Sequence, residues 1–390
     1  MSRLLAVLFG RLPIGWLQLT HSKGRLAAAI TGVAFANVLV FVQLGLASSI
    51  STATLRPYDF FNVDIMISAQ DANALTEGDN VARQWMFQAL ADPDVIAATP
   101  VYIGMMNWQQ SDQTLGLLAF GIDPNSDGFL SPDLQRKLAP LRLQNGAIID
   151  MNTRGLSPDI AAAIRPQSPQ TFEVSGQTVT LFDTFQGGGG FISDGHMVMS
   201  DQSFLALSNG RSAGAPDHIF LQVASGADPA IVADRLRGEI SDKSLRIRSY
   251  ADAMQEDITY QNTQRPTGII FGFGVVIGIL VGIVIVYQVL STDVADHMRE
   301  YATFKAMGYG QMFFLGIVLE EALILAVFGF IPGSIIGYGL LSGMREVTTL
   351  PIVLTGTMAF QVFFGTLAAC ALSGVLATRK LAAADPADLF

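Results

Sequence analysis

One short segment between two long apolar runs, residues 293–309, carries closely spaced ionisable and hydrogen-bonding side chains. They are Asp293, Asp296, His297, Arg299, Glu300, Tyr301 and Lys305, and the segment ends with Met307, Gly308 and Tyr309. Mixed charges of this kind, with no metal-ligand or nucleophile–base spacing, are suited to contact with a partner protein. The segment therefore indicates recognition and coupling, not catalysis.

The apolar residues of the same segment predict its local structure. Ala295, Met298, Ala302 and Ala306 recur at three- and four-residue spacing, which is typical of an amphipathic helix. The Asp residues at its start and Lys305 near its end suit the helix dipole, and glycines at 308 and 310 supply a stop. Because long apolar runs flank the segment, we expect a short helix at a membrane face that passes force to two spanning helices.

The sequence contains no recognisable motif for metal binding or phosphate binding. The four histidines are scattered, no HExxH zinc motif or GxxxxGK[ST] phosphate loop occurs, and the glycine run 187–190 lacks the lysine of a phosphate cradle. A flexible loop tip is the favoured interpretation of that run. The chain is thus expected to be a non-catalytic subunit with no metal and no cofactor of its own.

Four apolar windows set the fold class. Of 390 residues, 50% are hydrophobic and 14% charged, and residues 26–50, 268–290, 313–341 and 354–376 each suffice to cross a bilayer core of roughly 30 Å. Residues 26–50 are longer than the apolar core of a signal peptide, so we expect an uncleaved anchor. The predicted fold is a membrane α-helical protein with four transmembrane helices and a large α+β periplasmic domain between helices 1 and 2.

The basic residues predict the orientation. They lie before span 1, between spans 2 and 3, and after span 4, and only Arg345 lies between spans 3 and 4. By the positive-inside rule both termini are cytoplasmic. The inner membrane protein would then have an amphipathic N-terminal segment 1–25, a coupling helix 291–312 and a tail 377–390 in the cytoplasm, with a short loop 342–353 outside.

The outer domain, residues 51–267, is acidic and has no disulfide. It holds 25 Asp or Glu against 14 Lys or Arg, and the only cysteine, Cys370, falls in span 4. Strong acidity excludes nucleic acid as a partner. Two strand–helix–strand patterns, near 62–108 and 218–250, predict a ferredoxin-like layer, and residues 122–207 read as an inserted β-rich subdomain with a hairpin at Ser175 and Gly176.

Small and polar residues in the spans predict close helix packing. Such positions let helix backbones approach closely, and polar amides in hydrocarbon seek a partner helix. The candidates are Gly32, Ala36, Asn37 and Gln43 in span 1, Gly274, Gly278 and Gly282 in span 2, and Gly329, Gly333 and Gly337 in span 3. Contacts within one chain and between two chains both remain open, with the former favoured. Glu320 and Glu321 are interpreted as interfacial groups that reach water.

Long stretches of the sequence resemble a known family. The segments GIVIVYQVLSTDVADHMREYATFKAMGYGQ and LEEALILAVFGFIPG, with PIGWLQLTHSKGRL and GADPAIVADRLR, are similar to the DevC-like permeases of the MacB and FtsX group, the type VII ABC transporters. The resemblance covers residues 12–380. The sequence departs from the common family pattern at Met298, Arg299 and Phe304, which bears on which ATPase would dock.

The resemblance implies a homodimeric permease in the inner membrane that carries no substrate through a pore. A separate DevA-like ATPase pair, holding ATP and magnesium, would close beneath the coupling helix, and the residues from Asp293 to Tyr309 named above would face it. A DevB-like periplasmic adaptor and, through it, a TolC-like outer-membrane duct would complete a tripartite exporter of a glycolipid or another amphiphile. Membrane lipids would surround the spans.

Two alternatives from the same group remain open. One is an FtsX-like mechanotransmitter that regulates a cell-wall hydrolase, and the other is a lipoprotein-extraction permease. The large outer domain favours the exporter because it offers room for an adaptor. The cargo, the identity of the ATPase and adaptor, and the adaptor stoichiometry are not encoded in any recognisable motif.

Overall fold

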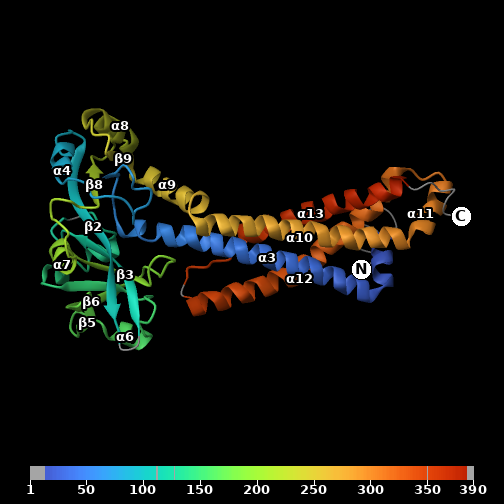
Figure 1. Ribbon diagram of the computed structural model, residues 1–390, viewed down its shortest axis with the longest axis horizontal. Coiled ribbons are helices and arrows are strands. Elements are labelled where there is room, and N and C mark those ends of the chain that lie inside the picture. Colours follow the sequence, from blue (N-terminus) through green and yellow to red (C-terminus); the bar gives the residue numbers. More distant parts are fainter. Residues whose placement is uncertain (1–13, 111–112, 127, 349, 384–390) are drawn as a thin grey trace. The chain divides into compact units, whose positions relative to one another are not determined.

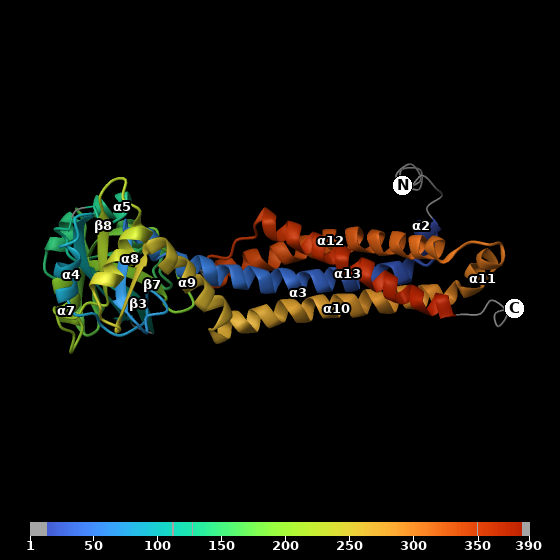
Figure 2. The same cartoon turned by 90° about the horizontal axis from the view of Figure 1, so that it is seen from above.

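The computed structural model describes residues 14–110, 113–126, 128–348 and 350–383 (Figures 1 and 2). Most of the predicted N-terminal segment, residues 1–13, and the end of the predicted tail, 384–390, lie outside the described residues. The chain divides into two compact units. One comprises Met1–Ser48, Ile269–Met344 and Ile352–Phe390, and the other comprises Ser49–Gly268 and Arg345–Pro351.

The first unit is a bundle of helices. Its elements are α2 (Ile14–His21), α3 (Lys23–Leu55), α10 (Pro266–Asp296), α11 (Met298–Ala306), α12 (Gln311–Thr348) and α13 (Gly356–Ala383). The four long helices run alongside one another in both views (Figures 1 and 2). Each is long and apolar enough to cross a membrane, as the four predicted spans require.

The coupling segment differs from the prediction at its start. We expected one helix from Asp293 onward, but α10 continues as far as Asp296 and α11 begins only at Met298. No glycine or proline lies between Leu290 and His297 to stop α10, and Val294 is buried in the bundle core. The two Asp residues therefore lie in the last turn of a spanning helix, where acidic groups oppose the helix dipole.

In its described residues, the second unit is built on nine hydrogen-bonded strands in the order β3-β7-β4-β6-β5-β2-β8-β1-β9. They are β1 (Ile65–Ala69), β2 (Val95–Gln109), β3 (Thr114–Ile122), β4 (Gly146–Asp150), β5 (Gln170–Val174), β6 (Gln177–Phe185), β7 (Gly195–Ser200), β8 (His218–Val223) and β9 (Leu245–Ser249). The connecting helices are η1 (Tyr58–Phe60), α4 (Gln84–Ala89), α5 (Pro132–Gln135), η2 (Ala139–Arg142), α6 (Pro158–Ala163), α7 (Asp201–Leu207), α8 (Pro229–Glu239) and α9 (Tyr250–Thr263).

Four of these strands belong to the two predicted strand–helix–strand units. They lie in the order β9-β1-β8-β2 with antiparallel pairing. Apolar residues of α4 and α8 share one core with Ile65, Ile67 and Ile219, so both helices cover the same face of the layer. The Asp228 side chain accepts a hydrogen bond from the Ala230 amide and caps α8, as the sequence indicates.

The remaining strands form a ring with β2. Because β2 also pairs with β3, the pairings close through β3, β7, β4, β6 and β5 back to β2. Strand β3 belongs to this ring, so the predicted insert at 122–207 starts too late. The hairpin at Ser175 and Gly176 is present between β5 and β6, and both residues have positive φ, 52° and 77°, as a type I′ turn requires.

The chain between the sheet and the second span is not one continuous rod. Helix α9 ends at Thr263 and α10 begins at Pro266. A proline disfavours helical backbone at the residue before it, which places the interruption at Gln264 and Arg265.

Candidate coupling site

Helix α11 has a charged outer side and an inner side that packs against the bundle. Tyr301 and Ala302 are buried, whereas Arg299 and Glu300 are exposed. Glu300 lies in the first turn and Lys305 in the last, which matches the dipole of this shorter helix. Gly308, with φ of 94°, ends the element.

The junction between α10 and α11 is held by His297. Its backbone amide donates to the Asp293 carbonyl at 3.1 Å, and its ring Nδ1 donates to the same oxygen at 3.0 Å. The imidazole thus adds a second hydrogen bond to a carbonyl in the last turn of α10. His297 is half-buried, so this residue shapes the element as well as lying on it.

Tyr301 fastens α11 to two other helices. Its side chain is 1% exposed, its hydroxyl donates to Gln18 Oε1 of α2 at 3.2 Å, and its ring meets the Phe314 ring of α12 edge-on at 5.6 Å. Burial, with the nearby Glu321 carboxyl, raises the pKa of Tyr301. Tyr301 is therefore an anchor, not the docking contact that the family resemblance assigned to it.

Arg25 of α3 neutralises the acidic end of α10. Its guanidinium lies 3.5 Å from Asp293 Oδ1 and 2.5 Å from Asp296 Oδ2. Asp293 is 2% exposed, so it too is an internal group, whereas Asp296 is exposed. A cation here offsets both the buried carboxylate and the unfavourable dipole at the helix end.

Glu320 and Glu321 do not reach water as expected. They are 1% and 0% exposed, and the Trp16 amide in the first turn of α2 donates to Glu320 Oε1 at 3.3 Å. Gly15 allows this approach, because a Cβ there would lie 2.9 Å from Glu321 Cγ. The positive end of the α2 dipole faces two carboxyl groups. The prediction failed because α2 covers a surface that the spans alone would leave open.

These contacts form one polar cluster, defined here as Gln18, Arg25, Asp293, Tyr301, Glu320 and Glu321. Glu321 interacts electrostatically with Asp293 and with Glu320. The cluster joins five helices: Tyr301 links α11 to α2 and α12, and Arg25 links α3 to α10. Gln18, Arg25, Glu320 and Glu321 were missing from the sequence-based site. For Glu320 and Glu321 the available signal was an ionisable pair inside an apolar run.

The predicted contact residues thus separate into three groups by their exposure. Asp293 and Tyr301 are buried supports, and His297 and Lys305 are half-buried. The exposed members, which can meet a partner directly, are Asp296, Arg299, Glu300, Met307, Gly308 and Tyr309.

The glycine stripes of α10 and α12 both pack on α3. A Cβ at Gly278 would lie 2.9 Å from Val40 Cγ2, and one at Gly333 would lie 2.8 Å from Asn37 Cβ. The same holds for Gly274 on Gln43, Gly282 on Ala36, Gly329 on Val33, Gly337 on Phe41 and, from the α3 side, Gly32 on Ile285. These contacts lie within one chain, and α3 is the helix on which the bundle is assembled.

Asn37 finds its partner in α13. The Thr366 hydroxyl donates to Asn37 Oδ1 at 2.5 Å, and Asn37 is 3% exposed. Gln43 is half-buried beside Gly274. Within the described residues, no group of three or more His, Cys, Asp or Glu side chains is placed to hold a metal ion.

Residues 272–386 match the family model described as FtsX-like permease C-terminal. No protein with a curated description matches the sequence. The periplasmic region of MacB from Actinobacillus actinomycetemcomitans is similar over 53% of this chain and 97% of its own, with 10% identity and a TM-score of 0.35.

A second solved structure gives a comparable result. The extracellular domain of the ABC-type transporter YknZ from Gram-positive bacteria is similar over 48% of this chain and 98% of its own, with 12% identity and a TM-score of 0.32. At such scores neither similarity identifies the fold of the sheet unit, and the family match is the stronger finding. By that match, the part of the chain that holds α11, α12, α13 and most of α10 is similar to the C-terminal part of the FtsX-like permeases.

Proposed function

We propose that this chain is the membrane subunit of an ATP-driven transporter of the ABC class and that α11 is its docking element for a separate ATPase. The observation that carries the proposal is the construction of α11. Its outer residues present charge, while Tyr301 fixes its inner side to α2 and α12. The match of residues 272–386 to FtsX-like permeases supports a subunit that works with such an ATPase.

The polar cluster suggests how force would travel. An ATPase pair that closes on ATP would displace α11, and the buried contacts of Tyr301, Asp293 and Arg25 would pass the displacement to α10 and α3. Both helices continue toward the sheet unit, since α3 ends at Leu55 and α10 begins at Pro266. Closely packed cores respond as units, so a shift at one end of a helix reaches the other.

We also propose an orientation, an assembly and a class of cargo. With α11 in the cytoplasm, the sheet unit lies outside the inner membrane, where a dimer of this chain would work with an adaptor and an outer-membrane duct to export a glycolipid or another amphiphile. The basic residues beside the spans support that orientation. The sequence similarity to DevC-like permeases supports the exporter over regulation of a cell-wall hydrolase.

Charge reversal on α11 tests the docking role. We expect Glu300→Lys combined with Arg299→Glu to weaken co-purification of the ATPase from native membranes in mild detergent, because both side chains are exposed and no buried contact of α11 is changed. Lys243→Glu, an exposed charge reversal before β9, is the matched control and should retain the ATPase. Equal recovery of the ATPase with all three proteins would refute the assignment.

Mass spectrometry of the same purifications tests the wider assembly. An adaptor together with the ATPase supports the exporter. A cell-wall hydrolase or a lone soluble carrier in place of the adaptor contradicts it and supports a mechanotransmitter or a lipoprotein-extraction permease.

A further inference from the structure

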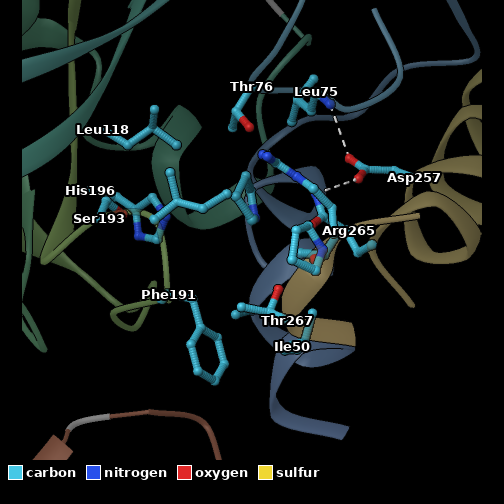
Figure 3. A pocket seen from close by; sticks show the side chains of 17 residues that line it. Ile50, Leu75, Thr76, Leu118, Phe191, Ser193, His196, Asp257, Arg265 and Thr267 are labelled. Carbon is cyan, nitrogen blue, oxygen red and sulfur yellow. Dashed lines mark hydrogen bonds between the residues drawn. The ribbon is translucent and has the colours of Figure 1, made fainter. Parts of the chain in front are cut away.

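The sheet unit contains a cavity of about 270 Å³ that the coupling function does not use (Figure 3). That volume is near the lower end of the range for small-ligand sites, roughly 300 Å³ and above. Its lining comes from five parts of the chain that are far apart in sequence. They are the end of α3 with Pro57, the Leu75–Thr76 turn, Leu118 of β3, the loop from Gly190 to Ser193 with His196, and α9 with residues 265–267.

The connectivity of the chain places this cavity at the bilayer surface. Ile50, Ala53 and Thr54 belong to the last turns of α3, and Pro266 and Thr267 open α10. Both helices are candidate spans. A cavity lined by the outer ends of two spanning helices opens where the hydrocarbon of the membrane ends.

The apolar part of the lining extends to an exposed rim. Leu75 and Leu118 are buried in the sheet unit, whereas Phe191 and Ile192 are 42% and 52% exposed. Figure 3 shows Leu118, Phe191 and His196 on one side of the space and Asp257 and Arg265 on the other. Two adjacent large apolar side chains, exposed beside an apolar cavity at this level, are suited to hydrocarbon and not to water.

The polar side chains of the cavity are mostly committed to one another. Asp257 accepts from the Leu75 amide at 2.9 Å, from the Tyr58 hydroxyl at 3.0 Å and from Gln261 at 3.2 Å. Arg265 pairs with Glu77. The hydrogen-bonding capacity of these groups is thus largely used within the protein, which favours an apolar occupant with its polar end at the opening.

The neighbouring glycine run is a fixed wall and not an anion cradle. The amides of Gly187 and Gly188 donate to Asp150 at 3.0 and 2.5 Å, and Arg56 donates to the Gly187 carbonyl at 3.0 Å. The flexible loop tip expected from the sequence is therefore anchored where the run begins. With its amides taken by a carboxylate, the run holds Phe191 and Ile192 at the rim.

We propose that this cavity binds one acyl chain of a membrane lipid drawn from the adjacent leaflet. The apolar wall would surround the chain, and Thr54 and Thr267 hydroxyls would lie near the lipid's polar head. This binding goes beyond the coupling function and does not depend on an ATPase.

Photo-crosslinking of the full chain in lipid nanodiscs tests the proposal. The probe is a phosphatidylcholine with a diazirine at the end of one acyl chain, and mass spectrometry locates the adducts. Because any spanning helix meets lipid, the informative region is 186–196, which lies far from the spans in sequence. We expect adducts there, and their absence alongside labelled spans would overturn the proposal.

Two matched substitutions give the test its specificity. Ile192→Asp changes the rim, and Ile231→Asp changes an isoleucine of α8 that is 65% exposed and outside the cavity. We expect adducts at 186–196 to fall about fivefold or more with Ile192→Asp, since a carboxylate replaces apolar contact, and to persist with Ile231→Asp. Equal losses would contradict the site.

A third substitution separates this proposal from the docking role. Ala53→Trp fills the cavity from α3 and should also remove the adducts, whereas Glu300→Lys should leave them unchanged. In the Glu300→Lys protein, loss of ATPase recovery together with intact adducts would support docking through α11 and would show that lipid binding does not depend on the ATPase. Intact adducts in a folded Ala53→Trp protein would contradict the lipid site alone.

Discussion

The contact between α12 and α3 can be tested with a single methyl group. At Gly333 a Cβ would lie 2.8 Å from Asn37 Cβ and 3.0 Å from the Ala34 carbonyl oxygen. The second neighbour is backbone, so it cannot rotate away. At Gly339, on the same helix, nothing lies within 4 Å of the added atom.

The magnitude follows from two opposing terms. Replacing glycine by alanine inside a helix is favourable by up to about 1 kcal/mol, and this term is common to both positions. Overpacking costs about 1–3 kcal/mol and applies only at Gly333. Gly333→Ala should therefore be less stable than Gly339→Ala by about 1–3 kcal/mol, which corresponds to roughly 5–150-fold in the unfolding equilibrium.

The assay is reversible unfolding in mixed micelles of mild and denaturing detergent, followed by helix content and by a thiol accessibility measurement on Cys370. Cys370 is buried in the bundle, so opening of the helices exposes it. The reasoning would be refuted if the two variants unfold at the same detergent fraction, because the close approach would then not contribute to stability.

Three further predictions concern the polar cluster and the sheet unit. Arg25→Met should destabilise the bundle by about 1–3 kcal/mol, since it removes a cation from buried Asp293. Thermal unfolding in micelles measures this loss, and the added substitution Asp293→Asn should restore part of it. Burial lowers the pKa of His218 below 6.5, so the native state binds fewer protons than the unfolded state. The stability that His218 contributes should be fully present above pH 6.5 and fall below it by up to about 1.4 kcal/mol per pH unit. The measurement is the opening free energy of the β8 amides, taken from hydrogen exchange after correction for the pH dependence of the intrinsic exchange rate, and an equal value at pH 7.5 and 5.5 would count against this. Gly176→Ala should lower the stability of the sheet unit by about 1 kcal/mol, because alanine is strained at a φ of 77°. Gly238→Ala in α8 meets no neighbour and should raise that stability, and thermal unfolding compares the two variants.

The sequence alone determined the features that depend on local composition. Four apolar runs have the length of bilayer spans, and hydrocarbon imposes helices on them whatever they pack against. The hairpin at Ser175 and Gly176 follows similarly from turn geometry, and the cap at Asp228 from the hydrogen-bonding needs of a helix start. The glycine stripes also identified a packing surface, because spacing alone places them on one side of a helix.

Only the tertiary structure decided which of these residues meet one another. In the coupling segment, Asp293 and Tyr301 differ little in sequence context from Asp296 and Glu300, yet the first two are buried by α2, α3 and α12 and the others are exposed. Helix periodicity could not reveal this, because the break at His297 changes the direction of the chain between them. The cavity was equally hidden, since its walls come from segments as distant as Ile50 and Thr267. Contacts between remote segments depend on how packed elements share space, and that information is not local to any stretch of the sequence.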